Sequence, residues 1–126
     1  MLFRSTWRPI GFTGLRGIDL HNRNAEFGIT IGEPDCRGKG YGTETTVLVL
    51  DYAFTARGLH SVYLTTAEFN IAGERAYKKA GFKEFGRQRQ CEMMGGRMWD
   101  LIYMDCLASE FTSPVLAREF GLAPQE

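Results

Sequence analysis

The sequence of 126 residues lacks the features that mark several classes of protein. No apolar run approaches the roughly 18 residues that a membrane-spanning helix needs, and no signal peptide opens the chain. The net charge is zero, with 15 basic and 15 acidic residues. This balance argues against a general binder of nucleic acids or membranes. Without repeats or low-complexity tracts, the chain is expected to form a single domain over residues 1–126.

Cysteine and histidine are also scarce. The three cysteines, Cys36, Cys91 and Cys106, are odd in number, and no pair has metal-ligand spacing. We therefore expect reduced thiols in a cytoplasmic protein, and no metal site. His21 and His60 occur in predicted turns, where a polar surface position is the expected one.

The spacing of apolar and turn residues predicts alternating strands and helices. Strands are expected over Met1–Trp7, Pro9–Leu20, Ala25–Ile31, Ser61–Thr66, Phe82–Met94 and Arg97–Cys106, and helices over Gly40–Arg57, Asn70–Ala80 and Ser113–Gly121. The tight turn at residues 21–24 should pair its flanking strands antiparallel. This order predicts an α/β protein with a mixed sheet and helices on its faces.

The segment Gly40–Arg57 can be interpreted in two ways. Its β-branched residues favour a strand, whereas its length and the C-terminal Gly58 favour a helix. Val47, Leu50 and Phe54 recur at helical spacing. We predict a helix.

A glycine-rich loop precedes this helix. Gly38, Gly40 and Gly42 alternate with Lys39 and Tyr41. Such a loop ahead of a helix presents free backbone N–H groups to an anion, although many similar loops are ordinary turns. A P-loop or dinucleotide site is disfavoured, because the loop has neither the Gly-Lys-Ser/Thr ending nor the Gly-x-Gly-x-x-Gly spacing.

A second feature lies in the helix that follows. Asn70 and Tyr77 are seven residues apart, which places them two turns apart on one helix face. They are either a helix cap with a half-buried aromatic residue or one wall of a ligand groove with an acid at one end. The segment from Arg75 to Arg97 carries seven basic residues against two acidic ones, which indicates either a solvated face or an anion-facing rim.

Together these motifs resemble the GNAT acetyltransferase superfamily. Arg37-x-x-Gly40-x-Gly42 resembles its acyl-CoA pyrophosphate loop, and residues 70–82, with an Asn, a helical Tyr and then Gly-Phe, resemble its second signature. The resemblance extends from about Pro9 to Cys106. Within the superfamily, the chain resembles the branch of ribosomal-protein N-terminal acetyltransferases. It implies the GNAT fold and transfer of an acetyl group from acetyl-CoA to an amine.

The resemblance also implies residues that would bind acetyl-CoA. The pyrophosphate would bind the backbone amides of the loop, the pantetheine arm would lie between two separated strands, and an amide of the first strand would polarise the thioester carbonyl. The implied binding residues are Ile29, Thr30, Ile31, Arg37, Gly38, Lys39, Gly40, Tyr41, Gly42, Thr43 and Asn70.

Two residues would take part in proton transfer. By resemblance, Tyr77 protonates the departing thiolate. Glu26 is the candidate to accept the proton of the amine, directly or through water, and its alternative is an outward-facing strand carboxylate. The acceptor stays open between a peptide N-terminus, a polyamine and an aminoglycoside.

The family normally begins with a strand and two helices that this sequence lacks. A shortened reading frame, a partner chain that supplies the missing wall, and an acyl-CoA-binding module with little turnover are the alternatives. Exposed strand edges favour a homodimer through the N-terminal strands or the hairpin Phe82–Cys106. The leading expectation is an N-acetyltransferase.

Overall fold

The computed structural model describes residues 2–3, 8–9, 11–31 and 41–114. The strands are β1 Leu2–Phe3, β2 Arg8–Pro9, β3 Gly11–Asp19, β4 Asn24–Ile31, β5 Ser61–Ala67, β6 Lys83–Met94 and β7 Arg97–Leu107. The helices are α1 Tyr41–Asp51 and α2 Ile71–Ala80, with a π-helical turn Tyr52–Ala56 and a 3₁₀ turn Ala108–Glu110.

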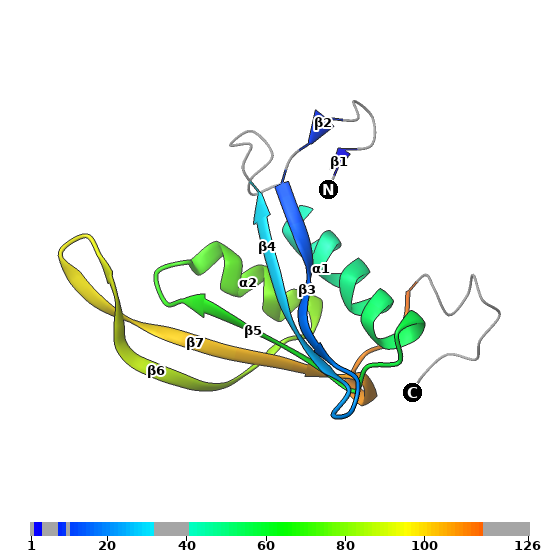
Figure 1. Ribbon diagram of the computed structural model, residues 1–126. Helices are drawn as coiled ribbons and strands as arrows, with labels where there is room; N and C mark the ends of the chain where they lie inside the picture. Colours follow the sequence, from blue (N-terminus) through cyan, green and yellow to red (C-terminus); the bar gives the residue numbers. More distant parts are fainter. Residues whose placement is uncertain (1, 4–7, 10, 32–40, 115–126) are drawn as a thin grey trace.

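Five strands form one mixed sheet in the order β3-β4-β5-β7-β6, as Figure 1 shows. Only β4 and β5 run parallel, and every other neighbouring pair is antiparallel. The mixed sheet predicted from the sequence is therefore confirmed, as is the antiparallel pairing on either side of the turn before residue 24.

The start of the chain differs from the prediction. Leu2–Phe3 pairs antiparallel with Arg8–Pro9 in a small separate sheet, so the expectation that Pro9 begins the long strand is wrong. That strand begins at Gly11. Proline has no N–H to donate to a ladder, which suits Pro9 to a short strand of two residues.

The hydrophobic core lies between one face of the sheet and both helices. Alternate residues of the strands point to this core, among them Phe27, Leu64 and Met104, and α1 contributes Leu50. Since α1 and α2 also contact each other, both lie on the same face. The mixed sheet with helices packed against it is as expected, and both described helices lie on one face; in the described part of the chain no helix covers the opposite face.

The predicted helix over Gly40–Arg57 is confirmed, but its last part widens. After Asp51 the backbone adopts π-helical bonding, with the Arg57 N–H donating to the Tyr52 carbonyl at 3.0 Å. The extra residue in this turn lets consecutive Ala53 and Phe54 both be buried. Gly58 then has φ +66°, the left-handed conformation expected after a helix C-terminus.

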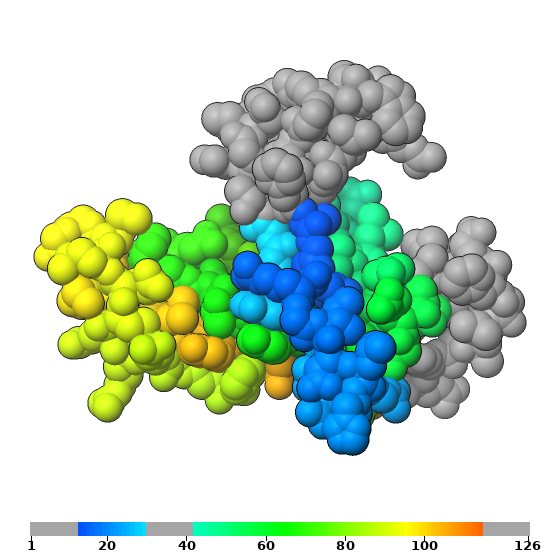
Figure 2. Space-filling view, in the orientation of Figure 1, coloured from blue at the N-terminus to red at the C-terminus, as the bar shows by residue number. Residues whose placement is uncertain are grey.

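The other predicted turns and ends are also confirmed. Gly81 ends α2 with φ +117°, and Gly95 and Gly96 join β6 to β7 with φ of +65° and +73°. The tip of this hairpin projects from the rest of the molecule (Figures 1 and 2). The predicted helix Ser113–Gly121 lies almost wholly outside the described residues. No helix in the described ranges is both long and apolar enough to cross a membrane.

Candidate active site

The central feature of the site is the separation of two parallel strands. β4 and β5 pair only through Asn24–Ser61, Ala25–Val62 and Glu26–Tyr63. Beyond these pairs β4 stays paired with β3, and β5 with β7, but not with each other. The facing edges of β4 and β5 therefore offer backbone N–H and C=O groups to an extended, peptide-like ligand.

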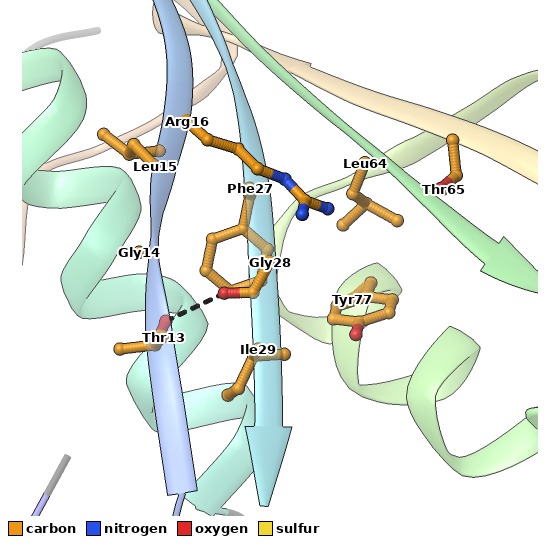
Figure 3. Close-up of a pocket in the computed structure, with 10 residues that line it drawn as sticks. All are labelled: Thr13, Gly14, Leu15, Arg16, Phe27, Gly28, Ile29, Leu64, Thr65 and Tyr77. Carbon is orange, nitrogen blue, oxygen red and sulfur yellow. Dashed lines mark hydrogen bonds between the residues drawn. The ribbon is translucent and has the colours of Figure 1, made fainter.

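A cavity of about 390 Å³ opens at this separation. It is lined by Thr13, Gly14, Leu15, Arg16, Phe27, Gly28, Ile29, Leu64, Thr65 and Tyr77. Figure 3 shows these residues converging from β3, β4, β5 and α2. The Thr13 hydroxyl donates to the Gly28 carbonyl at 3.3 Å, which ties β3 to β4 beside the cavity.

Tyr77 is the predicted catalytic residue that lies in this cavity. Its ring packs edge-on against Phe27 and Phe82, with centroids 6.2 Å away in both pairs. These contacts hold the ring on the side of α2 that faces the gap between β4 and β5 (Figure 3). A fixed phenol at a ligand cavity is suited to donate a proton.

Burial raises the pKa of the Tyr77 hydroxyl above its ordinary value of 10.0. The group therefore keeps its proton at neutral pH. A desolvated site also destabilises a thiolate, which raises the proton affinity of a departing sulfur in the same place. The raised pKa keeps Tyr77 protonated but makes it a weaker acid, whereas the raised proton affinity of the thiolate favours transfer of the proton to sulfur.

Glu26 lies next to the cavity in an ion pair with Arg16. The Arg16 Nε atom is 3.3 Å from Glu26 Oε1, and Arg16 Nη2 donates to Oε2 at 3.5 Å. The two residues are cross-strand partners in the β3–β4 hairpin. The predicted base is therefore present at the site but is already held by a cation, a partner that the sequence analysis did not foresee.

Asn70 does not line the cavity. Its Oδ1 atom accepts a hydrogen bond from the Gly73 N–H at 3.1 Å, and its Nδ2 atom donates to Thr66 Oγ1 at 3.3 Å. The structure thus confirms the helix cap. The role of Asn70 toward pantetheine stays a prediction.

The loop predicted to bind an anion falls mostly outside the described residues. Arg37, Gly38, Lys39 and Gly40 belong to that part, whereas Tyr41, Gly42 and Thr43 form the first turn of α1. The N–H groups of a first helical turn have no acceptors within the helix, so this end of α1 is suited to a phosphate. The strand residues Ile29, Thr30 and Ile31 complete β4, and Ile29 lines the cavity.

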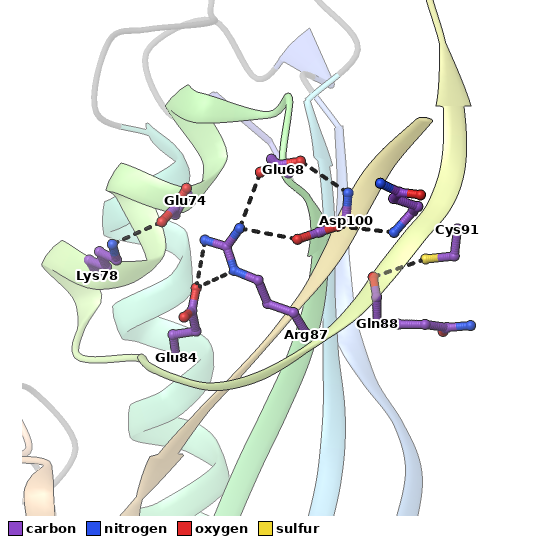
Figure 4. A network of polar contacts seen from close by, with 9 residues as sticks. Glu68, Glu74, Lys78, Glu84, Arg87, Gln88, Cys91 and Asp100 are labelled. Carbon is purple, nitrogen blue, oxygen red and sulfur yellow. Dashed lines mark hydrogen bonds and ion pairs between the residues drawn. The ribbon is translucent and has the colours of Figure 1, made fainter. Parts of the chain in front are cut away.

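Four of the seven basic residues from Arg75 to Arg97 have partners within the chain. Arg87 bonds Glu84, Glu68 and Asp100, as Figure 4 shows, and Lys78 bonds Glu74. Lys83 pairs with Glu110, and the Arg97 guanidinium stacks 3.8 Å from the Trp99 ring centre. These contacts favour the interpretation of a solvated, ion-paired face.

Comparison with known proteins identifies the family. Residues 1–83 match the family model described as an acetyltransferase (GNAT) domain. The chain belongs to this family. It is 35% identical over 102 residues to the spermidine N(1)-acetyltransferase of Vibrio cholerae, a match that covers 81% of this chain and 58% of that protein.

Other relatives of this chain are also named as N-acetyltransferases. The spermidine N(1)-acetyltransferase of Escherichia coli strain K12 is 33% identical to this chain, and the match covers 75% of this chain and 50% of that protein. A Bacillus subtilis protein, YdaF, provisionally named a ribosomal N-acetyltransferase, is 31% identical to this chain. The match covers 80% of this chain and 55% of YdaF. The chain therefore spans between half and three fifths of the length of these curated relatives.

The solved structures show the same fold. A mutant of the spermidine N-acetyltransferase SpeG from Vibrio cholerae matches with a TM-score of 0.76 and 33% identity, covering 86% of this chain and 63% of that one. The GNAT fold expected from the two motifs is thus confirmed.

Sequence reasoning missed three polar residues of the cavity, namely Thr13, Arg16 and Thr65. No signal in the sequence paired Arg16 with Glu26, because counting back from the predicted turn at residues 21–24 places Arg16 across from Ile29. That count depends on the register of the hairpin, which shifts between Arg16 and Asp19.

Proposed function

We propose that this chain is an N-acetyltransferase that transfers the acetyl group of acetyl-CoA to a primary amine by direct attack. The observation that carries the proposal is the separation of β4 and β5 with Tyr77 in the cavity between them. Membership of the GNAT family and the spermidine acetyltransferases among its relatives support it.

In this proposal acetyl-CoA extends from the start of α1 to the gap between β4 and β5. The pyrophosphate binds Arg37, the amides of Gly38 to Gly42 and Thr43 at the start of α1. The pantetheine arm bonds the open edges of β4 and β5, with Asn70 beside it. An amide between Ile29 and Ile31 then donates to the thioester oxygen and stabilises its developing charge.

The reaction needs no covalent enzyme intermediate. The neutral amine nitrogen attacks the thioester carbon, a C–N bond forms, and the C–S bond breaks. The Tyr77 hydroxyl protonates the departing thiolate, and the surplus proton of the amine passes to Glu26 through water. The products are an N-acetylated amine and CoA with a free thiol.

The acceptor class is proposed as a small primary amine, since two of the relatives bear the name of spermidine N(1)-acetyltransferase. A peptide N-terminus is the alternative that the name of YdaF supports. We also propose a cytoplasmic location, which fits the free thiols of Cys91 and Cys106.

Thermal unfolding with CoA tests the binding half of the proposal. At a ligand concentration of about 100 times Kd, the folded state should gain roughly 2.7 kcal/mol. Gly40→Val should abolish this gain, because a β-branched side chain fills the space that the pyrophosphate needs. No shift of the wild-type protein at millimolar CoA would disprove the binding site.

Release of CoA thiol from acetyl-CoA in the presence of a panel of amines tests the chemical half. Amine-dependent release, absent without acceptor, is expected. Binding of CoA without release for any amine would instead favour the acyl-CoA-binding module.

A further inference from the structure

We infer that Arg16 makes this enzyme selective for an acceptor amine that carries a carboxylate on a short carbon chain, such as a small amino acid. The inference rests on the proposed function and narrows its acceptor class, within the small primary amines, to one that differs from the spermidine in the names of two relatives. Three features carry it: the position of Arg16 in the cavity that it shares with Tyr77, the guanidinium N–H groups that remain for a ligand, and the charges that surround this cavity.

Arg16 extends into the cavity over Gly28. A Cβ atom added to Gly28 would lie 3.7 Å from Arg16 Nη2 and 3.9 Å from its Cζ atom. The guanidinium therefore lies directly over the backbone of β4. Figure 3 shows the side chain extending from β3 across β4 toward the gap that Tyr77 faces.

The ion pair with Glu26 leaves part of the guanidinium open. The contacts with Glu26 use Nε and Nη2, and a guanidinium has five N–H groups. The Arg16 side chain is 72% exposed, whereas that of Glu26 is 24% exposed. The cation is thus the more accessible member of the pair, and its remaining N–H groups suit a carboxylate.

The lining of the cavity supplies no further counter-charge for a polycation, because the neighbouring Glu26 carboxylate is already paired with Arg16. Its other polar side chains are the neutral Thr13, Thr65 and Tyr77, and no acidic side chain of the described residues lines it. Each ammonium group of a polyamine needs a carboxylate or a similar acceptor when it leaves water. Arg16 would also repel it, and such repulsion is an effective source of specificity.

The test compares matched acceptors on the CoA-saturated protein by calorimetry. The probes are β-alanine, its uncharged amide β-alaninamide, and spermidine. We expect wild-type protein to bind β-alanine about tenfold or more tightly than the amide, as a charge-assisted hydrogen bond allows. Spermidine should bind more weakly than β-alanine.

Variants locate the source of the preference. Arg16→Gln should bring the acid and the amide to parity, and Arg16→Glu should reverse the order so that spermidine binds best. The double variant Arg16→Gln with Glu26→Gln controls for the carboxylate that the single change leaves unpaired. Arg57→Gln removes an exposed arginine that does not line the cavity and should preserve the wild-type preference.

The rate of CoA thiol release with each probe separates the two hypotheses. Preferred binding of β-alanine without release would overturn the proposed function and leave the acceptor preference standing. Equal binding of acid and amide by wild-type protein, tighter binding of spermidine, or no binding of any probe would overturn the role of Arg16.

Discussion

At the scale of single residues, Tyr77 has a packing role in the structure and a chemical role in the proposed function. Its ring is held by Phe27 and Phe82, and its hydroxyl is the only part that phenylalanine would lack. The two roles can therefore be separated by one substitution.

We predict that Tyr77→Phe lowers turnover by about 10²-fold or more, while the affinity for CoA stays close to that of the wild type. The loss arises because the departing thiolate no longer has a proton donor. Steady-state kinetics and CoA titration measure the two effects. Tyr52→Phe, at an exposed tyrosine of the π-helical turn, is the control that should keep full turnover. Unchanged turnover of the folded Tyr77→Phe variant would remove Tyr77 from the catalytic residues.

The buried thiol of Cys106 makes the stability of the folded state depend on pH. Burial, followed by the nearby carboxylates of Glu110 and Asp105, raises the pKa of this thiol from 9.0 to about 11. The folded state then holds the thiol proton more tightly than the unfolded state. The contribution of the protonated Cys106 thiol to the free energy of unfolding is therefore complete below pH 9. It is lost as the pH rises through 11.

We predict that the free energy of unfolding falls by about 2 kcal/mol between pH 8 and pH 10.5 through this thiol. Urea unfolding at the two pH values measures the fall. Cys106→Ala should lose this part of the pH dependence, whereas Cys91→Ala should retain it. Equal pH dependence in wild type and Cys106→Ala would show that the thiol does not contribute.

At the scale of secondary structure, α2 connects the stability of the fold with the proposed cofactor site. Asn70 starts the helix, Tyr77 occupies its second turn, and Gly81 ends it. The lengths and ends of this helix therefore determine where the phenol lies relative to the open edge of β5.

Substitutions at Asn70 distinguish its cap from a role in cofactor binding. We predict that Asn70→Ala lowers the free energy of unfolding by about 1 kcal/mol, because the Gly73 N–H loses its acceptor. Asn70→Asp should preserve stability, since a carboxylate oxygen accepts the same bond and complements the helix dipole. Urea unfolding measures both variants.

The same pair of variants reports on the cofactor. If the amide of Asn70 also holds the pantetheine, Asn70→Asp weakens CoA binding with stability intact. Wild-type CoA affinity in Asn70→Asp would limit Asn70 to the cap.

At the scale of the whole molecule, the β6–β7 hairpin leaves large apolar side chains exposed. Phe85, Met93, Met94 and Met98 are between 40% and 64% exposed, and β6 is an edge strand of the sheet. Exposed edges and apolar surface are commonly covered by a second copy of the chain.

We predict a homodimer, and light scattering should give twice the chain mass of 14.2 kDa. Met93→Glu should weaken the dimer if the hairpin forms the interface, while Gln88→Glu, a polar change on the same strand, should not. An unchanged dimer in Met93→Glu would favour the N-terminal strands instead. A monomer mass for the wild-type protein would disprove the dimer.

The sequence by itself determined the local structure and the family. Asn70, Gly58, Gly81 and the pair Gly95–Gly96 act within a few residues of their own positions, so their caps and turns could be predicted without knowledge of the fold. The order of strands and helices was sufficient for the sheet type, and the cap Asn70 with Gly81 was sufficient for placing Tyr77 on a helix. The order of the loop residues 37–43 led to the same family.

Tertiary structure alone decided which distant residues meet. The placement of α1 and α2 on one face, the separation of β4 from β5 after Glu26, and the position of Arg16 over Gly28 all depend on strand register and helix packing. Register is set by contacts between segments far apart in the chain, and a shift of one residue turns a side chain to the other face. For that reason the sequence could suggest the chemistry of Tyr77 and Glu26, but not that the Arg16 cation pairs with Glu26 beside the cavity.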